Sequence, residues 1–288
     1  MSKAFAITAA CLAVVLSACA SAPQQQADVA LPAIFREGLV YVQVSVNGAA
    51  PVWMDLDNGT SPSAIDLDYA KSLGLKLKAG AGSATGIGSE HVEFFNTSAD
   101  VAAGSASRHI DFSASRLKGM VGPDGKPLAG VLGYSFLAGR ILVIDYPNQK
   151  VFFASASTPC TCDLPMGFDT NIPTVRATIG GHAVTALIDS GGMYELFATP
   201  AAVKLAGLQA EVDKARPVTG YGYAGAQSVK IGRAPDVVVG SIRRADPETV
   251  YSTFGTSPLK AEAALGARFL KDYRVTLNYR ARTVRLEP

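Results

Sequence analysis

Apolar and polar residues alternate along Val40–Val46, which is the pattern of a β-strand with one buried face. Asn47-Gly48 follows, a pair that favours a two-residue hairpin turn. We therefore expect the chain to return in a second strand that ends at Asp57. The same order of strand, turn and returning strand recurs in the second half of the chain, as Val175–Ile179, Gly180-Gly181 and Val184–Asp189.

Both halves continue with matching elements. Each half is predicted to contain a short helix ending near a glycine, a residue that suits a helix C-terminus. These helices cover residues 69–75 and 202–208. Each half then closes with two strands, at 141–145 and 151–153 in the first half and at 275–278 and 284–286 in the second.

Because strands dominate and helices are short, we expect an all-β protein. It should have a bilobal architecture, with two β-barrel lobes related by a pseudo-twofold axis. The expected N-terminal lobe covers residues 31–154 and the C-terminal lobe covers residues 172–288. Residues 155–171, which include Pro159 and Pro165, are expected to link them.

Each returning strand ends in an Asp-x-Gly tripeptide, Asp57–Gly59 in the first half and Asp189–Gly191 in the second. The two aspartates are 132 residues apart. Two similar apolar segments ending in glycine, Gly130–Gly133 and Ala263–Gly266, lie downstream at a spacing of 133 residues. An isolated Asp-Asn-Gly is a turn signal. Its repetition within the same long pattern predicts two carboxylates that meet on the pseudo-twofold axis.

A glycine-rich stretch lies between extended segments in each half, and we expect both stretches to form mobile β-hairpins. Neither has the glycine spacing and the following helix that a nucleotide-binding loop requires. The residues are Thr85, Gly86, Ile87 and Gly88 in the first half, and Gly220, Tyr221, Gly222 and Tyr223 in the second.

The composition is that of a globular protein. Hydrophobic residues make up 48% of the chain and the formal net charge is +2, which argues against disorder. Lysines and arginines are scattered, so the basic surface of a nucleic-acid-binding protein is not expected. The pair Arg243-Arg244 is interpreted as a solvated loop.

The N-terminus is interpreted as a targeting segment. Lys3 precedes an apolar stretch, Ala4–Leu16, that is too short to span a bilayer comfortably. The following Leu16–Cys19 resembles the lipobox of bacterial lipoproteins. This resemblance implies a signal peptide over residues 1–18, lipid on Cys19, and a flexible tether over residues 19–30.

The lipoprotein interpretation places the protein in the bacterial cell envelope, facing the periplasm. Ala20 follows the lipidated cysteine where an aspartate would direct retention, so the outer membrane is favoured. The alternative is an ordinary secretory signal, cut after Ala18 or Ala20, with a soluble product.

Cys160 and Cys162 are the cysteines left after the targeting segment is set aside. A disulfide is possible in an exported chain, although a bridge across one residue is strained and closes almost no loop. A metal site would need further ligands nearby. We interpret the pair as a feature of the linker whose redox state the sequence leaves open.

In this order of motifs the chain resembles the aspartic peptidase superfamily, in particular its retropepsin-like bacterial members. The resemblance covers residues 38–153 and 172–288. It implies a single-chain, two-lobed enzyme in which each half supplies one aspartate and one glycine-rich flap. No cofactor or metal is implied. Two complete halves make dimerisation unnecessary, so a monomer is expected.

The resemblance also assigns the site residues. It implies Asp57 and Asp189 as the catalytic pair, and the two hairpins described above as flaps that close over an extended peptide. The active-site loops are then Asn58, Gly59 and Thr60 in the first half and Ser190, Gly191 and Gly192 in the second.

Three residues depart from the family pattern. Asn58 stands where a threonine or serine would brace the two loops, and its amide is bulkier than a hydroxyl with different geometry. Gly192 replaces a small hydroxyl residue or alanine. Asp55 aligns with Leu187 and shares a strand face with Asp57. A third carboxylate there would disturb the pair, select basic substrate side chains, or face solvent.

Two carboxylates held about 3 Å apart cannot both ionise cheaply, so one keeps a proton; aspartic proteases are the standard example. The ionised member can take a proton from a water molecule, and the protonated member can donate to the scissile carbonyl oxygen. The sequence therefore predicts an aspartic endopeptidase acting on peptide or protein substrates. The alternatives are an inactive pseudopeptidase that binds peptide or a protein partner and, with less support, a structural lipoprotein.

Overall fold

The computed structural model describes residues 27–80, 93–222, 225–252 and 259–288. The predicted signal peptide, Cys19, the first glycine-rich stretch (Thr85, Gly86, Ile87, Gly88) and Tyr223 lie outside these residues. Within the described part of the chain, no helix is long and apolar enough to cross a membrane.

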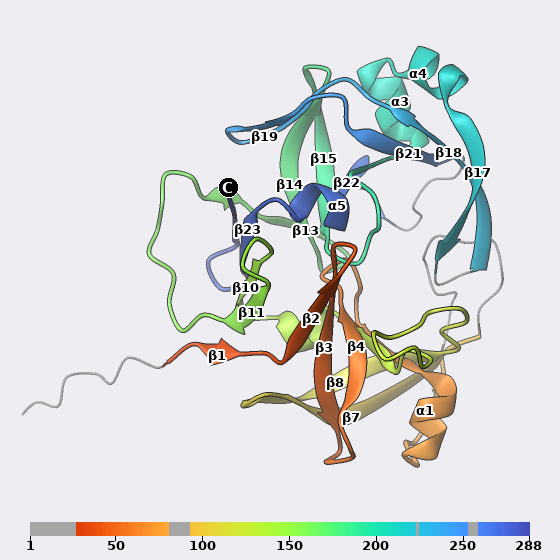
Figure 1. The fold of residues 1–288 in the computed structure, drawn as a ribbon, viewed down its shortest axis with the longest axis vertical. Helices are drawn as coiled ribbons and strands as arrows, with labels where there is room; N and C mark the ends of the chain where they lie inside the picture. Colours follow the sequence, from red (N-terminus) through yellow and green to blue (C-terminus); the bar gives the residue numbers. More distant parts are fainter. Residues whose placement is uncertain (1–26, 81–92, 223–224, 253–258) are drawn as a thin grey trace, which may run out of the picture.

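The molecule has two lobes, and the N-terminal lobe is the lower one in Figure 1. Its sheet has the order β2-β3-β4-β9-β5-β8-β7-β6, and an additional pairing of β3 with β7 closes a barrel. The strands are β2 (Ala33–Arg36), β3 (Leu39–Val46), β4 (Val52–Leu56), β5 (Ser63–Asp66), β6 (Lys78–Ala79), β7 (Phe95–Ala103), β8 (Ala106–Ser115) and β9 (Gly130–Leu132).

The C-terminal lobe repeats the central strands of the first. Its sheet has the order β17-β18-β21-β16-β22-β15-β14-β19-β20, and β13 pairs with β14. The strands are β13 (Gly167–Asp169), β14 (Ile172–Ile179), β15 (His182–Asp189), β16 (Leu196–Ala198), β17 (Arg216–Gly222), β18 (Gly225–Arg233), β19 (Val237–Val239), β20 (Ile242–Arg244), β21 (Glu248–Ser252) and β22 (Ala263–Gly266).

A third sheet joins the lobes. Its order is β1-β11-β10-β23-β24-β12, with three strands from each side of the lobe boundary. Leu142 on β10 lies opposite Leu277 on β23, and both are fully buried. The strands are β1 (Val29–Ala30), β10 (Ile141–Asp145), β11 (Lys150–Phe153), β12 (Leu164–Pro165), β23 (Arg274–Asn278) and β24 (Thr283–Glu287). The predicted bilobal all-β fold is thus confirmed.

The two predicted hairpins form because their turn residues adopt left-handed backbone angles. Asn47 and Gly48 have φ values of 49° and 74°, and Gly180 and Gly181 have 56° and 81°. Positive φ at both central residues is what a type I′ turn needs. Along β3 the side chains alternate between buried and partly exposed, as the sequence pattern predicted.

The two predicted helices are present, shifted towards the N-terminus by two or three residues. They are α1 (Leu67–Ser72), capped by the Asp66 carboxylate, and α3 (Pro200–Ala206), capped by the Thr199 hydroxyl. Each is followed by a left-handed glycine. The remaining helices are α2 (Tyr134–Leu137), α4 (Gln209–Lys214) and α5 (Ala267–Leu270).

The segments expected to be tether and linker carry some structure of their own. Val29–Ala30, the end of the expected tether, pair with β11, and the expected linker contains β12 and β13. Both segments gain backbone partners because they run along the exposed edges of sheets.

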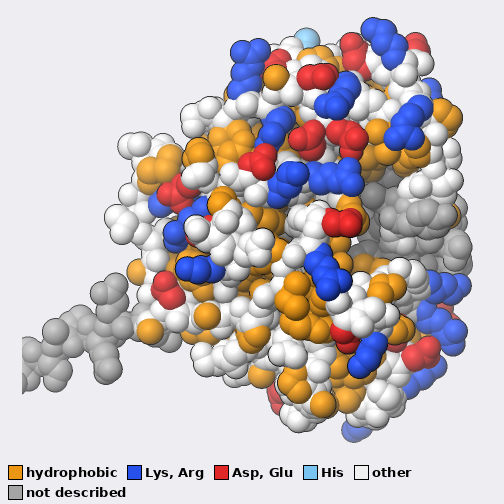
Figure 2. Space-filling model, in the orientation of Figure 1, with side chains coloured by type: hydrophobic (Ala, Val, Ile, Leu, Met, Phe, Trp, Pro, Cys, Tyr) orange, Lys and Arg blue, Asp and Glu red, His pale blue; other side chains and the backbone are white. Residues whose placement is uncertain are grey.

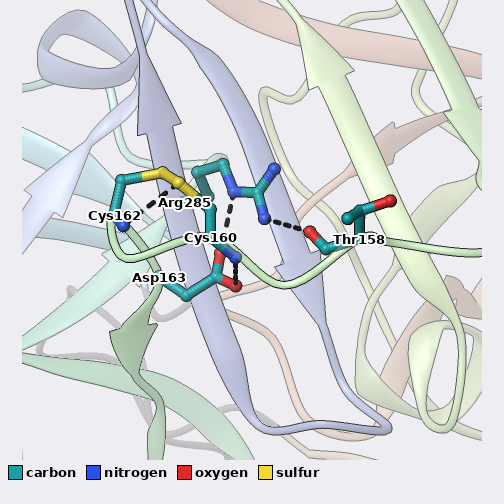
Figure 3. Close-up of a disulfide and its surroundings, with 5 residues drawn as sticks. All are labelled: Thr158, Cys160, Cys162, Asp163 and Arg285. Atoms are coloured by element: carbon teal, nitrogen blue, oxygen red, sulfur yellow. Dashed lines mark hydrogen bonds and ion pairs between the residues drawn. A yellow bond between two sulfur atoms is a disulfide. The ribbon is translucent and has the colours of Figure 1, made fainter.

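The linker also contains a disulfide between Cys160 and Cys162, shown in Figure 3. Beside it, the Asp163 carboxylate accepts hydrogen bonds from the backbone N–H of Cys160 (2.9 Å) and from Nε of Arg285 (2.8 Å). Arg285 also donates to the carbonyl of Thr158 (2.7 Å), so the linker is fastened to β24.

Candidate active site

The two aspartates are placed by equivalent strand pairings. β4 runs parallel to β9 and β15 runs parallel to β22, so each Asp-x-Gly loop begins beside an apolar segment ending in glycine. The backbone N–H of Asp57 donates to the carbonyl of Leu132 (3.0 Å), and Asp189 lies opposite Gly266 in the ladder. The downstream segments therefore anchor the loops.

A second pair of equivalent contacts fixes the far end of each loop. The backbone N–H of Tyr134 donates to the carbonyl of Thr60 (2.9 Å), and that of Ala267 donates to the carbonyl of Gly192 (2.7 Å). A Cβ on Gly133 would lie 2.2 Å from the Thr60 carbonyl oxygen. Glycine at the end of the apolar segment is therefore what allows this close approach.

The carboxyl groups of Asp57 and Asp189 meet across the lobe boundary. Their Oδ1 atoms both accept from the backbone N–H of Gly191, each at 3.2 Å. A Cβ on Gly59 would lie 2.5 Å from Asp189 Oδ1, and one on Gly191 would lie 2.4 Å from Asp57 Cγ. Only glycines let the loops bring the carboxyls together.

Burial and mutual repulsion govern the protonation of the pair. Burial, followed by the charge of Asp57, raises the pKa of Asp189 to about 8. Asp57 is itself buried. The pair therefore retains one shared proton at neutral pH, which is the state that acid–base chemistry requires.

Asn58 and Ser190 brace the two loops across the boundary. The Asn58 amide donates to the carbonyl of Ile188 (2.5 Å), and its oxygen accepts from the N–H of Ser190 (3.0 Å). In return, Ser190 Oγ accepts from the N–H of Asn58 (3.1 Å) and donates to the carbonyl of Leu56 (2.9 Å). Asn58 departs from the family pattern but takes part in the brace, because an amide, like a hydroxyl, both donates and accepts.

We call the Oδ1 atoms, which share the N–H of Gly191, the inner oxygens of the pair, and the Oδ2 atoms the outer oxygens. The two outer oxygens are held by two different residues. Thr60 Oγ1 donates to Asp57 Oδ2 (2.5 Å). Its counterpart Gly192 has no side chain, and the hydroxyl of Tyr194 donates to Asp189 Oδ2 instead. Sequence reasoning missed Tyr194; the available signal was the absent hydroxyl at position 192 with a hydroxyl residue two positions later.

Asp55 is buried, with 3% of its surface exposed, which excludes the interpretation that it faces solvent. It lies opposite Tyr41 on β3 and Val131 on β9, and its Oδ1 has no hydrogen-bond partner. Burial raises its pKa well above the usual range, and the charges of Asp57 and Asp189 add to this. Both causes favour the neutral form of Asp55, and a neutral carboxyl does not attract basic side chains by charge.

The second glycine-rich stretch forms part of a β-hairpin. Gly220 pairs with Gln227 and Tyr221 with Ala226, while Gly222 ends β17. The hairpin of β17 and β18 projects from the upper lobe at the right of Figure 1 and extends towards the lower lobe.

No group of three or more histidine, cysteine, aspartate or glutamate side chains among the described residues could hold a metal ion.

Two similar lobes, each contributing one aspartate to a shared carboxyl pair, define the fold and site of an aspartic-protease-like protein. The family model for aspartyl proteases matches the chain twice, over residues 42–136 and 175–269, and each match contains one aspartate of the pair. The chain belongs to the aspartyl protease family. The search of curated proteins found no match.

Proposed function

We propose that the protein is an aspartic endopeptidase that cleaves peptide bonds with a water molecule activated by Asp57 and Asp189. The observation that carries this proposal is the contact between the two carboxyls, whose Oδ1 atoms share the N–H of Gly191 at 3.2 Å. Two carboxyls held in this way share one proton and supply an acid and a base at the same point.

The reaction follows from this arrangement. The ionised carboxyl takes a proton from water, whose oxygen attacks the peptide carbonyl carbon, while the protonated carboxyl donates to the carbonyl oxygen. The tetrahedral intermediate then collapses and the C–N bond breaks. The carboxyl that took the proton from water gives it to the leaving nitrogen, and the other carboxyl takes a proton back from a hydroxyl of the intermediate. The pair ends with one proton, as it began, and no cofactor is needed.

The brace made by Asn58 favours an enzyme over an inactive relative. A pseudopeptidase has no need to keep its loops in register, yet Asn58 and Ser190 make four hydrogen bonds across the boundary. Such fixed support is what a catalytic pair requires, because small displacements of reacting groups cost large factors in rate.

The substrate that this site suits is an extended peptide. The β17–β18 hairpin offers backbone groups for pairing with an extended chain, a common mode of peptide recognition. Both aspartates come from one chain, so a monomer suffices for activity.

The proposed location is the bacterial cell envelope, with the protein facing the periplasm through a lipid on Cys19. The lipobox-like Leu16–Cys19 supports an anchor, and the disulfide between Cys160 and Cys162 is in keeping with an oxidising compartment. The outer membrane remains favoured, with Ala20 as the only residue that bears on it.

We do not propose a role in nucleic-acid binding. Arg243 pairs with Asp236 (2.9 Å) and Arg244 with Asp272 (2.5 Å), so this basic pair is neutralised locally. On the face shown in Figure 2, lysines and arginines are interspersed with acidic side chains. A continuous basic surface of the kind that binds phosphates is not seen there.

The test is to incubate the purified protein with a diverse peptide library from pH 3 to 8 and to read the cut sites by mass spectrometry. Asp57→Asn and Asp189→Asn should each lower cleavage by about 10²–10⁴-fold or more, because acid–base catalysis is lost. The control is Asp236→Asn, a change on the surface of the C-terminal lobe, which should cleave like the parent. Peptide binding without cleavage by the folded parent at every pH would instead identify a pseudopeptidase.

A further inference from the structure

Tyr194 is held rigidly beside the carboxyl pair. It is 7% exposed, its backbone N–H donates to the carbonyl of Gly192 (2.9 Å), and its carbonyl accepts from the N–H of Arg268 (3.2 Å). Its ring packs against Phe197, with 5.5 Å between the ring centroids. The phenol is therefore fixed in place, and its hydroxyl donates to Asp189 Oδ2.

Gly192 and Tyr194 form one arrangement. A Cβ on residue 192 would lie 2.5 Å from Cζ of the Tyr194 ring and 2.7 Å from Asp189 Oδ2. A side chain like that of Thr60, the counterpart in the other lobe, would therefore exclude the tyrosine. The glycine that departs from the family pattern is what makes room for a hydroxyl delivered from two residues further along the chain.

We propose that Tyr194 is a positioning residue that fixes the outer oxygen of Asp189 and thereby directs the shared proton of the pair onto the inner oxygen. This inference rests on the proposed peptidase function. The phenol of Tyr194 has a single O–H, which it donates to Oδ2 of Asp189. Oδ2 therefore acts as an acceptor. The proton of the neutral Asp189 carboxyl is left on Oδ1, which faces Asp57.

The same arrangement makes the two halves of the pair unequal. Asp57 is held by an aliphatic hydroxyl, that of Thr60, whereas Asp189 is held by a phenol, which is more acidic. The ionisable groups that interact electrostatically with Asp189 are Asp55 on β4, Asp57 directly after it, Tyr146 after β10, and Tyr194 itself. Of these, Tyr194 favours the ionised form of Asp189, while Asp57 opposes it.

Tyr194→Phe removes the phenol O–H and keeps the ring. Because the lost hydrogen bond favours ionised Asp189, the pKa of Asp189 rises and the basic limb of the kcat/KM profile should move up by about one pH unit. kcat should fall by about 10-fold with little change in KM, since substrate contacts are unaltered. An unchanged profile with parental kcat would overturn the proposal.

Tyr251→Phe is the matched control. Tyr251 is a buried tyrosine of the same lobe whose hydroxyl donates to the carbonyl of Arg233 (2.8 Å), far along the chain from the aspartates. Its loss should lower the melting temperature without moving the pH profile. A profile shift of equal size in both variants would assign the effect of Tyr194 to general loosening of the lobe.

A carboxyl titration by ¹³C NMR separates this inference from the proposed function. The Cγ resonance of Asp189 should titrate at higher pH in Tyr194→Phe than in the parent and in Tyr251→Phe, whether or not the parent cleaves peptides. If the parent is inactive but the shift is seen, the function fails and the role of Tyr194 stands. If the parent cleaves and the titration does not move, the reverse holds.

Discussion

At the scale of single residues, Asp55 is a position where the two lobes differ in chemistry. Its counterpart Leu187 is also buried, in an apolar cluster. A carboxyl oxygen buried without a partner costs about 1–3 kcal/mol, and Asp55 Oδ1 is such an atom. The N-terminal lobe therefore carries a destabilising group that the C-terminal lobe avoids.

Asp55→Leu is expected to stabilise the protein by about 1–3 kcal/mol at pH 7. A carboxyl whose pKa is raised by folding binds more protons in the folded state. Its stabilising contribution is complete below the unfolded pKa of about 4 and is lost as pH rises towards the folded value. The advantage of Asp55→Leu should therefore shrink as pH falls to 4, which chemical denaturation at several pH values will measure.

Asp145→Leu is the control for this prediction. Asp145 is also a buried aspartate, but its carboxylate accepts from Asn148 Nδ2 (2.9 Å) and lies 3.8 Å from Arg274. Removing a carboxylate that has partners should destabilise the protein. Equal destabilisation by both substitutions would show that the Asp55 carboxyl has hydrogen-bond partners in solution.

At the scale of elements, the loops after β4 and β15 depend on each other more than on their own lobes. The four hydrogen bonds between Asn58, Ser190 and the neighbouring carbonyls all cross the lobe boundary. Each loop is also anchored within its own lobe, by backbone hydrogen bonds to the residues in and directly after the apolar segments that end at Gly133 and Gly266. The position of the carboxyls is thus set jointly by two loops and two supporting strands.

Asn58→Ala should lower the free energy of unfolding by about 1–3 kcal/mol, because it leaves the carbonyl of Ile188 and the N–H of Ser190 unpaired and buried. Asn58→Thr should recover most of this loss, since a hydroxyl can also donate and accept. Asn148→Ala should cost less, because the Asp145 carboxylate that it contacts keeps the backbone N–H of Asn148 (3.2 Å) and lies 3.8 Å from Arg274. Urea denaturation will rank the variants, and a cost for Asn58→Ala no greater than that for Asn148→Ala would contradict a bracing role.

At the scale of the whole molecule, the sheet that joins the lobes is divided between them. β1, β11 and β10 precede the linker and β23 and β24 follow it, so the lobe boundary runs between β10 and β23. The buried side chains of Leu142 and Leu277 face each other across that boundary. Each half alone would leave an apolar strand edge uncovered, which is a template for aggregation.

Residues 1–154 and 155–288, expressed as separate chains, should associate into a 1:1 complex when mixed, and each alone should aggregate or lack cooperative unfolding. The control is the full chain cut between residues 154 and 155 after folding, which should remain assembled. Size-exclusion chromatography with light scattering will distinguish these states. Two stable monomeric halves would show that the shared sheet contributes little.

Local patterns were sufficient for the elements that repeat. Alternation along β3, the left-handed turn residues and the glycines after α1 and α3 are properties of a few neighbouring residues, and the structure has all of them. The predicted helix starts were two residues late, because the capping side chains of Asp66 and Thr199 lie before the apolar pattern begins.

The sequence by itself determined the duplication, the two lobes and the meeting of Asp57 with Asp189, because strand periodicity and the repeated Asp-x-Gly are local and occur twice. Only the tertiary structure decided how the pair is supported. The partners of Asn58 lie 130 and 132 residues away. The room for Tyr194 depends on a missing Cβ at position 192, and the burial of Asp55 depends on neighbouring strands. Such contacts form between segments far apart in the chain, and the pattern of residues within one segment does not specify them.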